Sequence, residues 1–311
     1  MSITVVGSIA YDAVETPFGQ RDRMLGGAAT HFALAASLLD QVRVVGPVGD
    51  DFGDAEMAVL QTRGTNVDDV ERVAGGKTFF WKGKYGWDLN TRETLDTQLN
   101  VFEHFAPKLS EASRSSDVLF LANIQPGLQL QVREQCEGAR FVALDSMNLW
   151  IDIAREELMA IIARVDCLIL NDEELRQLTQ KPNLISAAHQ VLGYGPSMIV
   201  AKQGEYGSAL ITKDDFFALP AYPLHEVVDP TGAGDTFAGG FVGFIAGQVG
   251  KPLTGDLLRN AMAYGTALAS FNVERFGTEG LEAVQPAAVL ERVRDLDRFA
   301  RFDPIEVELR R

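Results

Sequence analysis

Short runs of consecutive apolar residues alternate along this chain with longer segments in which apolar residues recur every three or four positions. The short runs are typical of strands buried on both faces, and the longer period is typical of helices that cover a sheet. The predicted strands are residues 3–7, 42–46, 118–122, 141–145, 167–171 and 198–201. Among the helices predicted between them are residues 28–39, 53–63, 155–164 and 184–192.

This alternation predicts an α/β fold with a mostly parallel, doubly wound sheet flanked by helices. In such sheets, ligands bind beyond the carboxyl ends of the strands. The residues at those ends are Gly7, Gly46, Ala122, Asp145 and Asn171. Two further strands, residues 208–212 and 216–219, flank a tight Lys-Asp-Asp turn and predict a hairpin.

Two segments interrupt the alternation, residues 10–22 and residues 73–100. The second is rich in glycine, threonine and alternating polar residues, which predicts antiparallel strands with one polar face. Such a small sheet cannot form its own core, so it should pack on the main domain or on a second subunit. Edge-to-edge pairing with a partner would form a homodimer, and the sequence leaves the oligomeric state open. Its aromatic residues form either a core for this sheet or a wall for a ligand: Phe79, Trp81, Tyr85 and Trp87.

The composition narrows the classes of partner. The 311 residues carry a net charge of −15 without a basic stripe, which argues against nucleic acid or an anionic membrane as partner. There is no basic N-terminal region followed by a long apolar stretch, and no run of about 18 apolar residues. The cysteines, Cys136 and Cys167, lie in no metal or redox spacing, and Cys167 is predicted to be a buried thiol. These features predict a cytoplasmic protein.

The segment from Asp229 to Phe237 reads Asp-Pro-Thr-Gly-Ala-Gly-Asp-Thr-Phe and opens an apolar helical stretch. Glycines at a helix start let unpaired backbone amides approach an anion, most often a phosphate. Asp235 then places a carboxylate beside that anion, where it can accept the proton of an attacking hydroxyl, as phosphoryl transfer to an alcohol requires. Taken alone, the segment is equally compatible with a plain turn and helix cap.

This segment resembles the C-terminal signature of the PfkB/ribokinase family of carbohydrate and nucleoside kinases, in which Asp-Thr-x-Gly-Ala-Gly-Asp-x-Phe recurs. The resemblance implies a single ribokinase-like domain over residues 1–311, with residues 10–22 and 73–100 as a small β-sheet lid. It implies that Asp235 is the catalytic base and that the transferring phosphoryl is held by the amides of Gly232, Ala233 and Gly234. ATP and Mg²⁺ are the implied cofactors. Thr231 is a candidate nucleotide contact, and Asp229 is a candidate neighbour of a monovalent cation such as K⁺.

Asn171 and Glu174 follow a predicted strand with the spacing of a helix capping box, which requires no ligand. The family carries Asn-x-x-Glu at this place, and there it organises water and Mg²⁺ near the phosphates. Because Mg²⁺ keeps several of its waters, the resemblance implies a largely water-mediated role for both residues, which is compatible with capping.

Three further positions are implied to contact the nucleotide. Gly204 and Gly207 match a Gly-x-x-Gly loop over the phosphates, and the loop ending at Gly277 matches one beside the adenine. Lys202 precedes the first of these loops and either neutralises phosphate charge or merely ends its strand.

The acceptor is expected near the N-terminus. In the family, an aspartate after the first strand and a Gly-Gly pair before the next helix bind hydroxyls of the sugar, and Asp12, Gly26 and Gly27 match them. A carboxylate accepts hydroxyl hydrogen bonds, and glycines let the ring approach the backbone. The family usually has asparagine a few residues later, where this chain has Thr30 and His31. We therefore count His31 as an acceptor candidate, although a lone histidine is more often structural.

Taken together, the sequence predicts an ATP-dependent phosphotransferase acting on a hydroxymethyl group of a sugar. A nucleoside kinase of the same family and a non-catalytic sensor of sugar or nucleotide on the same fold are the alternatives. A dinucleotide-dependent oxidoreductase would need Gly-x-Gly-x-x-Gly after the first strand, and a P-loop hydrolase would need Gly-x-x-x-x-Gly-Lys-Ser/Thr; the chain has neither.

Overall fold

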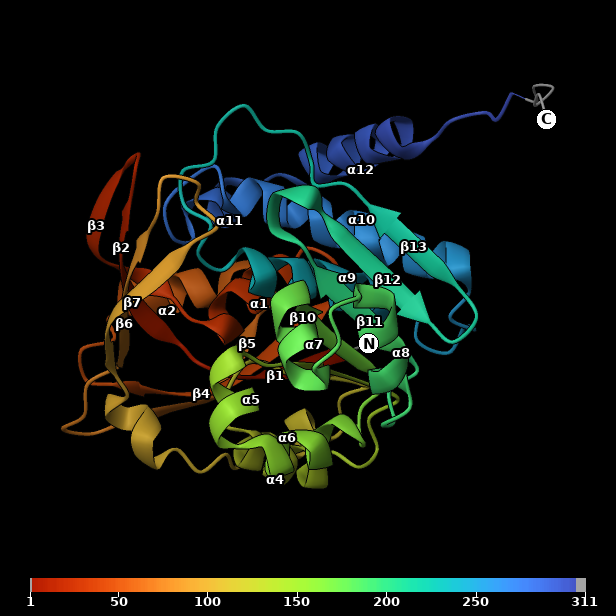
Figure 1. The fold of residues 1–311 in the computed structure, drawn as a ribbon. Helices are drawn as coiled ribbons and strands as arrows, with labels where there is room; N and C mark the ends of the chain where they lie inside the picture. Colours follow the sequence, from red (N-terminus) through yellow and green to blue (C-terminus); the bar gives the residue numbers. More distant parts are fainter. Residues whose placement is uncertain (1, 306–311) are drawn as a thin grey trace.

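The computed structural model describes residues 2–305 (Figure 1). Within them, the main sheet has nine strands in the order β13-β12-β11-β10-β9-β8-β1-β4-β5. All neighbours from β11 to β5 pair in parallel. The pairs β11–β12 and β12–β13 are antiparallel. The strands are β1 (Ser2–Val6), β4 (Gln41–Gly49), β5 (Asn66–Val73), β8 (Val118–Leu121), β9 (Phe141–Asp145), β10 (Cys167–Asn171), β11 (Met198–Lys202), β12 (Ser208–Thr212) and β13 (Phe216–Leu219).

Helices cover both faces of this sheet, as the continuous apolar strands predicted (Figure 1). Successive residues of β8 face opposite sides: Phe120 stacks on Phe32 of α1, with ring centroids 4.1 Å apart, while Leu119 and Leu121 belong to the core on the other side. One face carries α1 (Ala28–Ala36), α2 (Asp54–Leu60), α9 (Ala233–Ala246), α10 (Gly255–Asn272) and α12 (Pro286–Ala300). The other carries α4 (Pro126–Gln135), α5 (Asn148–Ile153), α6 (Arg155–Ile162), α7 (Asp172–Thr179) and α8 (Leu184–Leu192).

A second, four-stranded sheet lies at one side of the molecule, in the order β3-β2-β6-β7 (Figure 1). Its strands are β2 (Ala10–Thr16), β3 (Gly19–Gly26), β6 (Phe79–Tyr85) and β7 (Arg92–Gln98), and we call it the small sheet. The predicted antiparallel pairing is confirmed within the second segment, where β6 pairs with β7, and β2 pairs with β3 in the same way. The two segments meet through β2 and β6, which pair in parallel, and this pairing was not predicted.

The small sheet also differs from the predicted segments at its boundaries. β3 continues through Gly26, and Val73 ends a strand of the main sheet, so the second segment contributes strands only from Phe79 onward. β7 is an edge strand exposed along its whole length. Pairing of this edge with a second copy stays a prediction.

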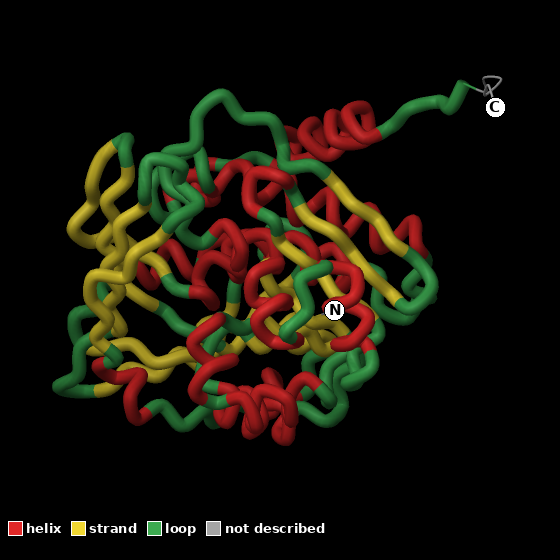
Figure 2. Tube along the Cα trace, in the orientation of Figure 1, coloured by secondary structure: helices red, strands yellow, loops and turns green. Residues whose placement is uncertain are grey.

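The carboxyl ends of the parallel strands meet the start of α9 and the small sheet. A loop without helix or strand, residues 220–230, leads from β13 to the turn before α9 (Figure 2). Cys136 and Cys167 are both buried free thiols, as predicted for Cys167. No helix within residues 2–305 is long and apolar enough to cross a membrane.

Candidate active site

The start of α9 is built so that only glycine fits at its N-cap. Gly232 has φ 74°, and a Cβ there would lie 2.4 Å from the His31 ring. The Ala233 amide donates to the Pro230 carbonyl (3.2 Å), whereas the Gly232 and Gly234 amides have no acceptor within residues 2–305. The predicted anion site therefore keeps two free amides, and its third amide is already paired within the turn.

Asp235 lies in the first turn of α9 and is partly exposed. Burial is the main cause that raises the pKa of its carboxyl to about 7, and the charge of Asp145 adds to it, while Lys202 acts in the opposite direction. A carboxyl with this pKa is about half ionised at neutral pH. It can accept a proton and release it again, as a general base must.

Lys202, at the end of β11, lies against the start of α9. Its Nζ donates to Asp145 Oδ2 (3.1 Å) and would be 2.9 Å from a Cβ at Gly234. Burial alone would lower the pKa of Lys202, but Asp145, Glu174 and Asp235 together raise it above its usual value. Lys202 is therefore a protonated cation among three carboxyl groups beside the free amides.

Asp145 is a site residue that the sequence pattern marks only as the end of a predicted strand. It is buried at the end of β9, and its carboxylate holds the Lys202 ammonium group. One signal in the sequence could have identified Asp145 as a site residue. It is the charged residue that ends the otherwise apolar strand β9, at the edge of the sheet where ligands bind.

Asn171 and Glu174 form the predicted capping box at the start of α7. Asn171 Oδ1 accepts from the Glu174 amide (2.7 Å), and Glu174 Oε2 accepts from the Asn171 amide (2.8 Å). Burial is the main cause that raises the pKa of Glu174 to about 7, and Lys202 opposes it. Capping is thus confirmed, and water-mediated contact with Mg²⁺ stays a prediction.

The donor set fits a magnesium ion that takes most of its ligands from phosphate and water. Within residues 2–305, no three His, Cys, Asp or Glu side chains are placed to hold a metal by themselves. Glu174, Asp145 and Asp235 nevertheless gather carboxylate oxygens, the ligand type that Mg²⁺ prefers, beside the free amides.

Asp12 lies on β2, buried against the end of β3. A Cβ at Gly26 would be 1.9 Å from Asp12 Oδ2, so glycine is required there for the carboxylate to fit. Burial first, then the charges of Asp229 and Asp235, raises the pKa of Asp12 to about 7, and a hydrogen bond with the Gly27 backbone lowers it. The predicted acceptor residues Asp12, Gly26 and Gly27 are therefore assembled in one place, near the predicted base.

His31 lies under the anion site, with its ring against Gly232. Asn272 Nδ2 donates to the Thr231 carbonyl (2.7 Å), so Asn272 Oδ1 is the acceptor for His31 Nδ1 (3.0 Å). Burial lowers the pKa of His31 to about 4, so the ring is neutral, and its buried Nε2 has no partner among the described residues. An acceptor contact through His31 stays a prediction. Asn272 was missed because it is 241 residues away from His31 in the sequence.

Asp229 is completely buried between the two loops beside the site. Its Oδ1 accepts from the Thr231 amide (2.9 Å) and its Oδ2 from the Gly277 amide (3.0 Å). Gly277 has φ 56° and packs against Met24 and Leu25 of β3. Its predicted contact with adenine, and the predicted cation beside Asp229, stay predictions.

The small sheet also contributes to this site. The Tyr85 hydroxyl, from β6, lies 3.2 Å from Thr231 Oγ1, and its side chain is buried. Gly204 and Gly207 both have positive φ (57° and 100°), and the turn after β6 reaches the Gly204 loop through Asn90. From the sequence, Tyr85 was predicted only to belong to a core of this sheet or to a ligand wall.

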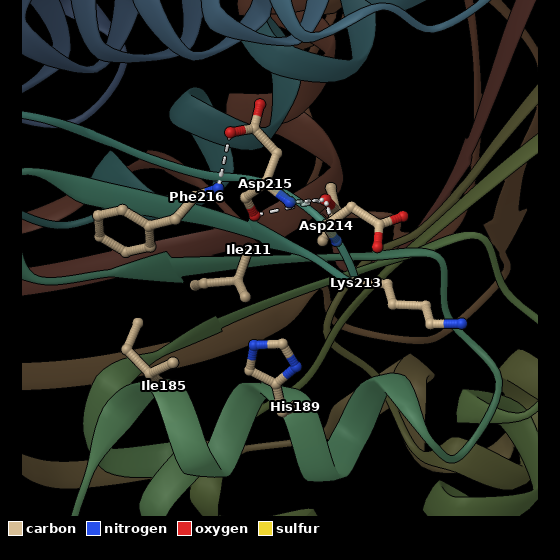
Figure 3. Close-up of a pocket in the computed structure, with 8 residues that line it drawn as sticks. Ile185, His189, Ile211, Lys213, Asp214, Asp215 and Phe216 are labelled. Carbon is tan, nitrogen blue, oxygen red and sulfur yellow. Dashed lines mark hydrogen bonds between the residues drawn. The ribbon is translucent and has the colours of Figure 1, made fainter.

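A separate hollow of about 410 Å³ lies between α8 and the β12–β13 turn (Figure 3). Because β12 runs antiparallel to β11, Thr212 stands beside Met198 at the amino end of that strand. The hollow is therefore at the opposite edge of the sheet from Lys202 and Asp235.

Comparison with known proteins agrees with this geometry. The pfkB family of carbohydrate kinases matches residues 2–283. A cytidine kinase of Thermococcus kodakarensis is 30% identical over 262 residues, which cover 81% of this chain and 91% of the relative. The nucleoside kinase structure of Methanocaldococcus jannaschii superposes with a TM-score of 0.76 at 22% identity, over 94% and 98% of the two chains. The structure of Arabidopsis thaliana ribokinase complexed with ribose and ATP has a TM-score of 0.73 at 21% identity, over 94% and 98%.

Proposed function

Because this chain belongs to the pfkB family of carbohydrate kinases, we propose that it transfers the γ-phosphoryl group of ATP to a hydroxymethyl group on a sugar or on the ribose of a nucleoside. One observation carries the proposal. Asp235, with a pKa of about 7, is near enough to Lys202 and to Asp12 for their charges to interact, and two free amides lie at the start of the same helix. This is the arrangement that positions an alcohol and a phosphoryl group around one base.

In the proposed reaction, Asp12 and the Gly26–Gly27 backbone bind hydroxyl groups of the acceptor. Asp235 accepts the proton of the hydroxymethyl group as its oxygen attacks the phosphorus. The free amides of Gly232 and Gly234, with the Lys202 ammonium group, stabilise the charge on the transferring phosphoryl. Bound Mg²⁺ would neutralise phosphate charge, with Glu174 and Asn171 holding its waters.

The base is tested by replacing Asp235 with asparagine. We expect Asp235→Asn to lower kcat by roughly 10²–10⁴ while the melting temperature changes little, because the amide keeps the shape but accepts no proton. The measurement is ADP release with ribose, fructose, cytidine and adenosine as acceptors.

The matched control is Asp214→Asn, an exposed aspartate in the β12–β13 turn at the far edge of the sheet. Near-native turnover of Asp235→Asn would show that Asp235 is not the catalytic base. Ligand binding without ADP release from any acceptor, in the native protein, would identify a sensor instead of an enzyme.

Between the two acceptor classes, we propose that a nucleoside fits better than the free sugar expected from the sequence. The Trp81 ring belongs to neither core cluster of the described residues; it lies over Gly83, and its Nε1 donates to Thr94 Oγ1 (3.3 Å). Trp81 pairs with Asp12 in the small sheet, so both side chains point to the same face. A half-buried indole beside the hydroxyl-binding carboxylate supports stacking of a nucleobase.

Trp81→Leu tests this acceptor class. We expect kcat/KM for nucleosides to fall about 10–100-fold, the usual worth of base stacking, and kcat/KM for ribose to change less than about threefold. Trp87→Leu is the matched control, because Trp87 is 92% exposed in the turn after β6. Equal losses for nucleosides and ribose, or a native enzyme that prefers free ribose, would favour the sugar.

A further inference from the structure

The small sheet contacts both predicted phosphate-binding loops, the one before α9 and the one that contains Gly204. At one end, the Tyr85 hydroxyl of β6 contacts Thr231 beside the anion site (3.2 Å). In the turn that follows, Asn90 Nδ2 donates to Glu205 Oε1 (3.2 Å), and its Oδ1 is 3.2 Å from the position of a Cβ on Gly204. The segment between these contacts therefore crosses the space where the nucleotide phosphates are proposed to lie.

Arg92 is the first residue of β7 and follows this turn directly. It is paired with Tyr85 across the two strands, so its side chain leaves the same face of the small sheet as the buried Tyr85 ring. The Arg92 guanidinium carbon is 5.5 Å from the centre of the Trp81 ring, which lies on that face as well. The guanidinium group is thus directed along the face of the small sheet that looks into the site.

Apart from the Trp81 ring, the charge of Arg92 has no partner in the part of the chain that the structure describes. Its guanidinium group makes no hydrogen bond or ion pair there, and the side chain is exposed. Its positive charge lowers the pKa of Asp235 and of Glu174, which come from the main sheet side of the site. Lys202, by contrast, is already tied to Asp145.

We propose that Arg92 is a catalytic residue whose guanidinium group donates hydrogen bonds to oxygens of the transferring phosphoryl group. The inference rests on the proposed phosphotransfer. The acceptor oxygen forms its bond to phosphorus as the bond to the ADP oxygen breaks, and Asp235 takes the hydroxyl proton. Arg92 stays protonated throughout and neutralises charge that spreads over the phosphoryl oxygens.

This role links catalysis to the position of the small sheet. An arginine fork matches phosphate oxygens in a way that a lysine ammonium does not. Arg92 comes from the small sheet, whereas the other proposed phosphate-binding groups come from the main sheet and α9. All of these groups can therefore contact the phosphoryl group together only when the small sheet lies against the main sheet as in this structure.

The test compares Arg92→Gln and Arg92→Lys with the native enzyme. We expect kcat to fall roughly 10²–10³-fold in Arg92→Gln, as for loss of one transition-state donor, with acceptor KM within about threefold. Binding of Mg·ADP should be unchanged within about threefold, whereas binding of Mg·ADP with aluminium fluoride, which mimics the transferring phosphoryl, should weaken at least about tenfold. Arg92→Lys should recover only part of the loss. Lys84→Gln, on the opposite face and paired with exposed Glu15, is the control and should match the native enzyme.

Turnover of Arg92→Gln within threefold of native would overturn the inference, as would equal weakening of Mg·ADP and of its aluminium fluoride complex. A melting temperature equal to that of Lys84→Gln verifies that the variant is folded. If Asp235→Asn is inactive while Arg92→Gln is active, this inference fails alone. If the native protein phosphorylates no acceptor, the proposed function fails with it.

Discussion

Asp12, Glu174 and Asp235 are carboxyl groups whose pKa is raised to about 7, in each case mainly by burial. Keeping such groups partly out of water destabilises their charged forms. The positive charge of Lys202 offsets part of this cost for Glu174 and Asp235, whose pKa values it lowers. A carboxylate that gains a hydroxyl donor or a metal ion on ligand binding recovers part of that cost, so the charges of the site favour such ligands.

The charge of Asp145 predicts a shift in the pH dependence of turnover. In the proposed mechanism Asp235 must be ionised to accept a proton, so kcat/KM should rise with pH with an apparent pKa of about 7. Asp145→Asn removes a negative charge that raises the pKa of Asp235, so this rise should move to lower pH. Lys202→Gln removes a positive charge that lowers the same pKa, so the rise should move to higher pH.

Initial rates measured from pH 5 to 9 in buffers of constant ionic strength check both shifts. Movement of the two variants in the same direction would contradict the assigned charges around Asp235.

The sequence predicted parts of this site where the contacts lie between neighbouring residues, as in the capping box at the start of α7. The Gly232–Asp235 segment and the Asn171–Glu174 capping box are each contained within a few positions. Residues that reach the site from distant segments were not predictable in the same way. Asp145 contacts Lys202 across 57 positions and Tyr85 contacts Thr231 across 146, and no short motif records such contacts.

At the scale of elements, the position of α9 depends on two glycines, one facing α1 and the other facing α10. A Cβ at Gly239 would lie 2.4 Å from the Phe32 carbonyl of α1, and one at Gly240 would lie 2.8 Å from Gly265 Cα of α10. These glycines let α9 pack at backbone distance against two helices at once. The start of α9, with its free amides, is thereby held firmly at the edge of the sheet.

Gly239→Ala should therefore destabilise the protein. The added methyl group meets backbone atoms of α1 that cannot move aside, so we expect the free energy of unfolding to fall by about 1–3 kcal/mol. Gly247→Ala, at the end of the same helix, is the control: its Cβ would meet nothing closer than 3.7 Å, and its φ of −63° suits alanine. Urea unfolding of both variants makes the comparison, and equal stabilities would show that α1 and α9 can separate without cost.

Elements were predictable where burial imposes one pattern on every residue. The β12–β13 hairpin and α8 were predicted with the bounds that the structure has. β5 was missed, because this edge strand has polar residues on both faces and contains no apolar run. The parallel pairing of β2 with β6 was also missed, because strand direction in a small sheet depends on the path of the chain between its segments.

At the scale of the whole molecule, the raised carboxyl pKa values predict that the ligand-free protein loses stability as pH rises. The folded state binds protons more tightly than the unfolded chain does between about pH 4 and 7, so stability is greatest at the acid side of that window and falls through pH 7. From pH 6 to pH 8, Asp12 alone should account for a loss of about 1 kcal/mol.

Asp12→Asn checks the sign of this dependence. Asparagine carries no charge at either pH, so the loss of stability between pH 6 and pH 8 should be smaller in the variant than in the native protein by that amount. Denaturant unfolding without ligand gives both values. A variant that loses as much stability as the native protein would show that Asp12 ionises normally.

The pairing of β2 with β6 also bears on how the molecule is made. Lys84 of β6 contacts Glu15 of β2, 69 positions earlier in the chain, and β3, α1, β4, α2 and β5 lie between them in the sequence. During synthesis, β2 and β3 emerge well before β6, and a hairpin of two strands is barely stable in water and has an open edge. β6, the strand that covers this edge, follows β1, β4 and β5 in the chain, so we expect Tyr85 and Arg92 to reach the candidate active site among the later events of folding.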